Sequence, residues 1–349
     1  MSQQDASALL GWTGFPPLPE SFVLPSLKKW IGPTFAVVLF GLSIRLLMRE
    51  AAETSWEQFV SGLTGIRPVY LAFAAILIAM NYALLTSYDI LALRYVARSL
   101  PLRRVMLVSF LGYSLGNNLG TFLAAAPLRF RFYSRWGLSH SQIATIIGML
   151  GLTFWSGLWL LGGIVLTLVP IDLPPERQLP VSTRAFGVTL LALWTTYWIA
   201  CSVWHRPWPI YGLRIQPPSS GLMMTQSSVA AVDLFISATA LYLVLPGGAT
   251  VPFSLVLAAY LCGIAIALVS QVPGGLGILE AIMLYLLKDA VGGEVTASLL
   301  IFRTLYYVVP LVFGMLTLVG HEIYSGAIER IRTDPNAAPP AAVRESHVS

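Results

Sequence analysis

Hydrophobic residues occur along this chain in long runs, and polar residues gather between the runs. Runs long enough to cross a membrane begin near the following residues: Trp30, Val69, Val105, Ile143, Phe186, Leu222, Phe253 and Val295. An α-helix needs about 20 apolar residues to cross the hydrocarbon core of a bilayer. The pattern therefore predicts an all-α fold, a polytopic membrane bundle of about eight transmembrane helices.

Polar residues interrupt the run that begins near Val105. Asn117 and Asn118 bring hydrogen-bonding groups that lipid tails cannot satisfy. Arginines flank the run on both sides: Arg94, Arg98, Arg103 and Arg104 before it, and Arg129, Arg131 and Arg135 after it. Arginine-rich connections favour the cytoplasmic side, so a complete crossing between these two conflicts with the positive-inside rule. We therefore predict a re-entrant helical hairpin, whose polar turn is buried in protein or lines a cavity.

Small residues recur every four positions within the same run, at Gly112, Gly116, Gly120 and Ala124. On a helix these residues form one smooth stripe, against which another helix backbone can pack closely. The stripe suits a contact within the chain or a contact between two copies of it. A homodimer is therefore one of two expectations.

A second interruption follows the run that begins near Phe253, at Pro273, Gly274, Gly275 and Gly277. Backbone groups freed by such a turn can line a cavity or bind a polar headgroup, and the simpler alternative is a broken helix. One interrupted segment in each half of a chain indicates a transport site near the bilayer midplane. An inverted repeat of the two halves is a hypothesis that goes with this pattern.

Composition places the chain among membrane proteins. Of its 349 residues, 56% are hydrophobic and 11% are charged, and the mean hydropathy is +0.74. The net charge of +5 lies in the connections, which indicates membrane topology and lipid contact and argues against a nucleic-acid partner. We expect an interfacial N-terminal segment over residues 1–29, a transmembrane domain over residues 30–322 and a disordered tail over residues 323–349. Both termini are expected in the cytoplasm.

Three charged residues fall inside apolar runs. Asp233 lies near the middle of its run, where an ionisable group costs about 2.5 to 3.5 kcal/mol and normally faces a partner or a water-filled cavity. A structural bond between helices is the alternative to a functional role. Glu280 and Arg303 are expected to form a buried pair that joins the last helices. Asp89, by contrast, is expected to cap its helix or pair with Arg94 at the surface.

Motifs for catalysis and cofactors are missing. The four histidines and two cysteines are scattered without the spacing of metal ligands, and no Gly-rich phosphate loop ending in Lys and Ser or Thr occurs. Ser139 and Ser141 flank His140, but no nucleophile elbow accompanies them, so we expect a helix start with a capping serine. We therefore predict no catalytic residue, no cofactor and no metal.

Several motifs in order resemble one family. They are the run Tyr88–Tyr95, the segment from Asn117-Asn118 to the arginine-aromatic stretch Arg129–Leu138, the cluster Thr153–Trp155, the turn Pro273–Glu280, and Arg303 with Tyr306 and Tyr307. Over residues 30–322 the chain is similar to the membrane domain of the lysylphosphatidylglycerol synthase/flippase family, also called multiple peptide resistance factor. Proteins of that family join a lipid-flipping membrane domain, further helices and a cytosolic aminoacyltransferase domain that loads lysine or alanine onto phosphatidylglycerol. This sequence covers the first part of that pattern.

The resemblance implies a lipid translocase of a bacterial inner membrane, which moves an aminoacylated or anionic phospholipid such as lysyl-phosphatidylglycerol between leaflets and is not an enzyme. Headgroup binding is assigned to the arginine and asparagine positions named above, Arg129, Arg131, Arg135, Asn117 and Asn118, with the phosphate captured by the arginines. Asp233 and Glu280 are assigned to the ammonium group. The first alternative is a lipid-binding subunit of a separate lipid-modifying enzyme. The second is a phosphatidylglycerol aminoacyltransferase, which no loop of this sequence is large enough to house.

Overall fold

The computed structural model describes residues 56–169, 182–204, 208–210, 213–245, 251–270, 277–291 and 295–333, together with Gly41 and Arg45. The chain divides into two compact units, Gly41–Gly320 and a second made of Met1–Phe40 with His321–Ser349. All contacts discussed below lie within the first unit. The expected span that begins near Trp30 and the expected interfacial segment lie outside the described residues.

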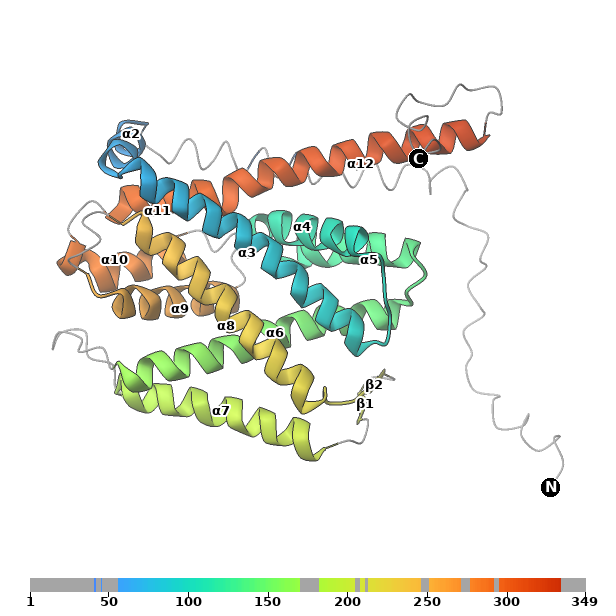
Figure 1. Cartoon of the computed structure of the whole chain (residues 1–349), viewed down its shortest axis with the longest axis horizontal. Helices are drawn as coiled ribbons and strands as arrows, with labels where there is room; N and C mark the ends of the chain where they lie inside the picture. The colour runs from blue at the N-terminus through green and yellow to red at the C-terminus, as the bar shows by residue number, and fades with distance from the viewer. Residues whose placement is uncertain are drawn as a thin grey trace, which may run out of the picture. The chain divides into compact units, whose positions relative to one another are not determined.

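Helices make up nearly all of the described chain (Figure 1). Their bounds are α2 (Trp56–Gly65), α3 (Pro68–Tyr95), α4 (Leu102–Leu119), α5 (Ala126–Arg135), α6 (His140–Leu168), α7 (Thr183–Val203), α8 (Ser220–Leu243), α9 (Phe253–Ser270), α10 (Ile278–Val291), α11 (Val295–Arg303) and α12 (Val309–Thr333). Two π-helical turns, η1 (Thr121–Ala125) and η5 (Thr304–Val308), join α4 to α5 and α11 to α12. A short antiparallel hairpin, β1 (Trp208–Ile210) and β2 (Leu213–Ile215), lies between α7 and α8.

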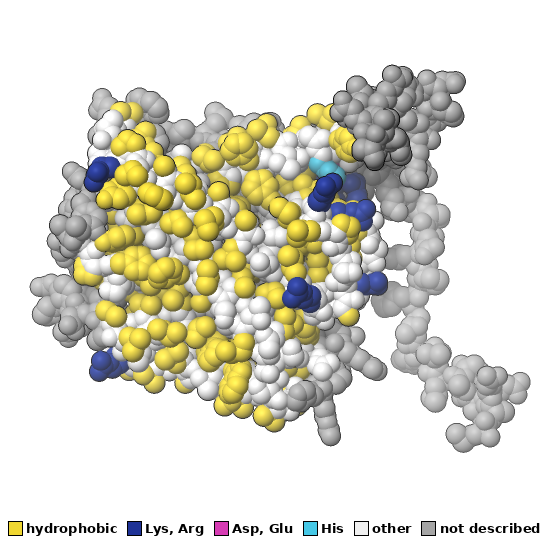
Figure 2. Space-filling model, viewed as in Figure 1, with side chains coloured by type: hydrophobic (Ala, Val, Ile, Leu, Met, Phe, Trp, Pro, Cys, Tyr) yellow, Lys and Arg dark blue, Asp and Glu magenta, His cyan; other side chains and the backbone are white. Residues whose placement is uncertain are grey.

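The all-α membrane fold is confirmed. Within the described residues, six stretches are long and apolar enough to cross a membrane, namely α3, α6, α7, α8, α9 and the stretch Val295–Ser325. Figure 2 shows apolar side chains spread over the visible face of these helices. The β hairpin was not expected, because the basic residues of this segment predict a loop between two helices. The last helix also differs from expectation: it continues to Thr333, beyond residue 323 where the tail was expected to start.

The run that begins near Val105 forms the predicted helical hairpin instead of a single span. Helix α4 ends at Gly120, whose φ of 96° is a left-handed conformation that favours glycine, and α5 returns beside α4 (Figure 1). Glycines of α4 permit this close return. A Cβ atom on Gly116 would lie 2.7 Å from the Cβ atom of Ala125, and one on Gly112 would lie 2.7 Å from Nη1 of Arg129. Gly112 and Gly116 thus pack within the chain, whereas Gly120 supplies the turn.

Serine caps fix where three helices begin. Ser139 accepts a hydrogen bond from the backbone N–H of Gln142, whose side chain accepts one in return from the backbone N–H of Ser139. This capping box confirms the expected helix start after Leu138. Ser182 and Ser219 cap α7 and α8 in the same way, each accepting a bond from a backbone N–H three residues ahead.

Helices α3 and α8 lie antiparallel at the centre of the bundle (Figure 1). Asn81 bonds to Ser237, and Tyr88 bonds to Asp233, so positions later in α3 meet positions earlier in α8. A continuous cluster of buried apolar side chains includes residues of this pair. Helices α6, α9, α10 and α11 also contribute side chains to the cluster. Small residues allow close packing, because a Cβ atom on Gly157 of α6 would clash with Ala230 of α8.

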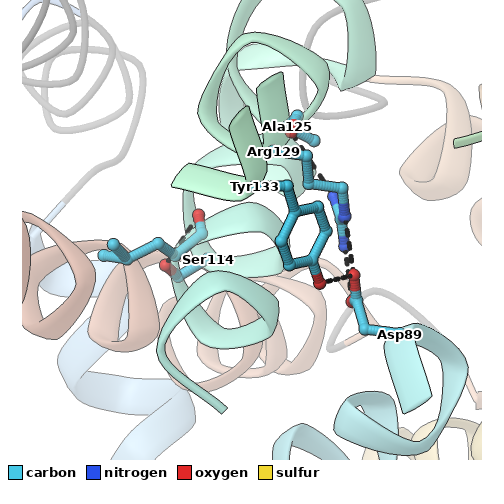
Figure 3. Close-up of polar contacts among 6 residues, drawn as sticks. Asp89, Ser114, Ala125, Arg129 and Tyr133 are labelled. Carbon is cyan, nitrogen blue, oxygen red and sulfur yellow. Dashed lines mark hydrogen bonds and ion pairs between the residues drawn. The ribbon is translucent and has the colours of Figure 1, made fainter. Parts of the chain in front are cut away.

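A buried ion pair holds the hairpin of α4 and α5 against α3. Nε and Nη2 of Arg129 donate to the two carboxylate oxygens of Asp89 at 3.0 and 2.9 Å, and the Tyr133 hydroxyl donates to Oδ1 at 2.8 Å (Figure 3). Asp89 is 0% exposed and Arg129 is 2% exposed. The expectation that Asp89 lies at the surface beside Arg94 is therefore wrong. Because α5 folds back over the end of α3, it brings in a partner 40 positions away in the chain.

Enlarging Gly116 should destabilise the hairpin. We expect Gly116→Leu to lower the stability of the protein by roughly 1–3 kcal/mol, because its side chain would overlap Ala125. Gly148→Leu is the matched control, since Gly148 is exposed and a Cβ atom there meets nothing within 4 Å. Heat-induced loss of the monodisperse protein in detergent measures both. Equal midpoints for the two variants would contradict the close contact.

Removing the Arg129 guanidinium should cost more than removing an exposed one. We expect Arg129→Met to destabilise the protein by roughly 3–5 kcal/mol, because Asp89 would stay buried without a cation. Arg135→Met, at the exposed end of α5, should cost little. The double variant Asp89→Leu with Arg129→Met should recover much of the loss. Failure of the double variant to recover any stability, in the same unfolding measurement, would argue against a charge-pair origin.

Candidate functional site

A cavity of about 270 Å³ lies where the hairpin of α4 and α5 meets the central helices. Its wall combines apolar side chains of α6 and α9 with many polar groups. The polar lining residues are Tyr88, Tyr113, Asn117, Thr121, Arg129, Asp233, Ser237, Tyr260, Tyr306 and Tyr307. They come from segments far apart in the sequence, so folding of the whole bundle creates the site. Ordered polar groups in an otherwise apolar bundle are typical of a binding site for a polar ligand.

Asp233 lies on the wall of this cavity. Its side chain is buried, with a residue exposure of 5%, and its Oδ2 accepts a hydrogen bond of 2.7 Å from the Tyr88 hydroxyl. The ring of Tyr88 packs edge-on against that of Tyr113, with the centroids 6.0 Å apart. Among the described residues no lysine, arginine or histidine forms an ion pair with Asp233. The carboxylate is therefore held by a neutral partner.

A polar network beside Asp233 connects three helical segments. The side-chain amide of Asn81 donates to Ser237 and to the Tyr306 hydroxyl, both at 2.9 Å. The hydroxyls of Ser237 and Tyr306 lie 3.1 Å apart, and Tyr82 donates to the backbone carbonyl of Tyr306 at 3.0 Å. Asn81 is 0% exposed. These bonds join α3, α8 and η5, and two members of the network, Ser237 and Tyr306, line the cavity.

Arg129 brings a cation to the lining of the cavity. Its guanidinium is bound to Asp89 and also lies over the ring of Tyr113, 5.0 Å from the centroid. The Tyr113 hydroxyl is buried and has no hydrogen-bond partner in the part of the chain that the structure describes. The Tyr113 hydroxyl and the Arg129 guanidinium together could bind an anionic group. Arg131 and Arg135 lie further along α5 and are not in the cavity lining.

The two neighbouring asparagines have different surroundings. Asn117 lines the cavity. Asn118 instead donates its side-chain N–H groups to the backbone carbonyls of Ser114 and Tyr307, at 2.8 and 3.1 Å. The bond to Tyr307 reaches η5, where the π-helical turn changes the backbone bonding pattern. Asn118 thus joins α4 to η5, while Asn117 faces the space where a ligand would bind.

Glu280 and Arg303 form the expected pair, at 3.2 Å, near the second interruption. The Arg303 guanidinium lies 5.7 Å from the centroid of the Tyr307 ring. Neither charged residue lines the cavity, but their neighbours Leu279 and Tyr307 do. Gly277, with φ of 78°, precedes α10. Pro273, Gly274 and Gly275 lie outside the described residues.

Sequence reasoning gave the tyrosines around Asp233 no role in the site, although Tyr88 and Tyr306 belong to the family motifs, and it missed Asn81. Tyrosines in apolar runs are usual at membrane interfaces, so nothing in their local pattern distinguishes Tyr88 or Tyr260 from an interfacial anchor. Asn81 carries a usable signal, because an amide inside a long apolar run needs a partner as much as Asn117 does. Among the described residues, no group of three or more His, Cys, Asp or Glu side chains could hold a metal ion.

Known proteins resemble this chain over most of its length. An uncharacterized protein of Synechocystis sp. (slr0712) is 33% identical over 307 residues, which are 87% of this chain and 95% of that protein. The inner membrane protein YbhN of Escherichia coli is 31% identical over 84% of this chain and 92% of YbhN. The phosphatidylglycerol lysyltransferase of Staphylococcus haemolyticus is 24% identical over 84% of this chain, but over only 34% of the lysyltransferase.

The family comparison agrees with these relatives. The sequence profile described as the lysylphosphatidylglycerol synthase TM region matches residues 30–314. This match covers the described helices α2 to α11 and the start of α12, and with them every residue that lines the cavity. The resemblance noted from the sequence motifs is thereby confirmed, and the chain belongs to the family of the lysylphosphatidylglycerol synthase transmembrane region.

Proposed function

We propose that this protein is a lipid translocase, which moves an aminoacylated or anionic phospholipid between the leaflets of a bacterial inner membrane. One observation carries the proposal: an apolar helical bundle encloses a cavity whose wall holds both the Arg129 guanidinium and the Asp233 carboxylate. Charged groups inside a membrane bundle normally mark the route of a polar substrate. Both α4–α5 and α9–α10 form hairpins next to this cavity.

The proposed headgroup path begins at the end of α5 that is expected in the cytoplasm. Arg131 and Arg135 capture the lipid phosphate there, and Arg129, Asn117 and the Tyr113 hydroxyl receive it in the cavity. An ammonium group, where the headgroup carries one, is drawn to Asp233. The acyl chains stay outside among lipid tails, which the exposed apolar side chains of the bundle contact. No covalent bond is made or broken along this path.

The alternatives differ in what else they require. A lipid-binding subunit of a separate enzyme would keep the cavity but need a partner enzyme. A phosphatidylglycerol aminoacyltransferase would need an acceptor site for an aminoacyl-tRNA, and the chain matches only a third of the length of the curated lysyltransferases. The translocase is favoured because the Arg129 guanidinium and the Asp233 carboxylate line one cavity within the helical bundle.

Purified protein in proteoliposomes should accelerate transbilayer movement of a labelled phospholipid. Aminoacyl-phosphatidylglycerol and phosphatidylglycerol are tested separately, with protein-free vesicles as the baseline. We expect faster movement of one or both lipids, and the ratio of the two rates reports the headgroup preference. Rates equal to the baseline for both lipids, under every ion gradient tested, would refute the translocase proposal and favour the accessory subunit.

A large side chain in the cavity should block that movement. Gly151 of α6 lines the cavity, and a Cβ atom there meets nothing within 4 Å, so Gly151→Trp can be accommodated and fills part of the space. Gly148→Trp, three positions earlier on the same helix, is the matched control because Gly148 is exposed and outside the lining. We expect a loss of at least about tenfold in the rate for Gly151→Trp only.

Both tryptophan variants should retain the unfolding midpoint of the wild type in detergent, which separates blockage from misfolding. An unchanged rate in a folded Gly151→Trp variant would show that the lipid headgroup travels elsewhere.

A further inference from the structure

Asp89, Glu280 and Asp233 are three carboxylates of the described bundle, and they differ in their polar partners. Asp89 and Glu280 each pair with an arginine, at 2.9 and 3.2 Å. Asp233 is 5% exposed, yet the hydrogen bonds that its carboxylate accepts come from neutral side chains, the Tyr88 hydroxyl at 2.7 Å and the amide of Asn81. An ionised carboxylate without a cation is costly in an apolar medium, whereas a protonated one is not. Of these three carboxylates, Asp233 is therefore the one without an arginine partner among the described residues, so no opposite charge holds it in the ionised form.

The groups that face Asp233 from the elements packed around it are nearly all neutral. From α3, α4, α9 and η5 they are Tyr82, Tyr88, Tyr113, Tyr260 and Tyr306. Helix α6 contributes only apolar residues and glycine to the cavity lining. Among the described lining residues the one cation is Arg129 of α5, and Asp89 already neutralises it. The cavity region thus holds two carboxylates and one guanidinium, which leaves one negative charge.

We propose that Asp233 binds and releases one proton in each transport cycle, so that lipid movement is coupled to a proton gradient. This inference rests on the proposed translocase function and adds its energy source. The arrangement has the two features that coupling needs: a buried carboxyl group without a fixed counter-ion, and a cavity that gives it contact with the transported headgroup.

The proton step is simple in chemical terms. While the cavity is open to the acidic side, a carboxylate oxygen of Asp233 takes a proton from hydronium and leaves water behind. On the other side the carboxyl group gives the proton back to water. Tyr88 can serve both states, because its hydroxyl donates to the carboxylate and can turn to accept from the neutral acid. The proton and the lipid cross in the same conformational change.

A pH difference across proteoliposomes tests the coupling directly. Labelled phosphatidylglycerol, which carries no amine, is followed until the leaflet ratio is constant, with the membrane potential clamped and protein-free vesicles as the baseline. If one proton moves with each lipid, each unit of pH difference should change the steady-state ratio by about tenfold. Without an imposed pH difference, a pH-sensitive dye in the lumen should report a proton flux only when the lipid is supplied unequally to the leaflets.

The outcomes separate this inference from the function on which it rests. Fast movement to a ratio of one at every pH difference, with no proton flux, would refute the coupling and keep the translocase. No acceleration at all would contradict the translocase itself. A ratio that follows a sodium gradient in place of the pH difference would assign a metal ion, and not a proton, to the cavity.

Substitutions of Asp233 test whether this residue carries the transported proton. Asp233→Glu keeps a carboxyl group and should keep the dependence on pH difference. Asp233→Asn keeps an acceptor for Tyr88 but cannot titrate, so it should abolish both the dependence and the proton flux. A pH-dependent ratio that survives in Asp233→Asn would overturn the assignment. An effect of Asp233→Asn confined to aminoacyl-phosphatidylglycerol, without any proton flux in the wild type, would assign Asp233 to the lipid ammonium alone.

Carbodiimide labelling gives a second measurement. It uses the wild-type protein alone and so does not depend on whether a substituted protein folds. The reagent adds to protonated carboxyl groups in apolar surroundings, and peptide mass mapping finds the modified residue. We expect labelling at Asp233, faster at lower pH, and none at Asp89, because Arg129 and Tyr133 occupy both of its oxygens. Equal labelling of the two residues, or labelling of Asp89 alone, would contradict the distinction between them.

Discussion

The bond between Asp89 and Arg129 is the constraint on which the rest of the bundle depends. Each group is charged and removed from water, so neither can stay buried without the other. To bring them together the chain must reverse at Gly120, and α4 must present a glycine at position 112 beneath the guanidinium. The cavity then lies between the returned hairpin and the central helices. A single long-range pair thus determines where the polar lining can form.

Much of the fold could be predicted from the sequence because the bilayer admits few structures. Apolar run lengths located the described spans, and the conflict between two arginine-rich connections predicted the hairpin of α4 and α5. The partner of Asp89 could not be predicted, since an interaction across 40 positions leaves no local pattern and Arg94 was the nearer cation. The site was predicted only in part: Asp233 stands out as a charge in an apolar run, but its tyrosine surroundings exist only after folding.

The two halves of the described chain share an arrangement. The central helices α3 and α8 run antiparallel, each is followed by a pair of helices that pack together, and a carboxylate pairs with an arginine in each half. Antiparallel central helices are what an inverted repeat requires, although the sequence similarity between the halves is weak. We propose that the two halves are related as an inverted repeat, in which two equivalent gates would flank the cavity. A conformation open to one leaflet then has a counterpart open to the other.

The π-helical turns η1 and η5 have a mechanical consequence. Each contains one residue more than an α-helical turn would, and residues of both turns line the cavity. When the extra residue moves along a helix, the stretch that it passes rotates by about 100° while its hydrogen bonds are exchanged one at a time. The side chains of η1 and η5 that line the cavity would turn with such a shift, without unfolding of the helix. These turns would allow the protein to change shape without exposing unbonded backbone N–H and C=O groups to lipid.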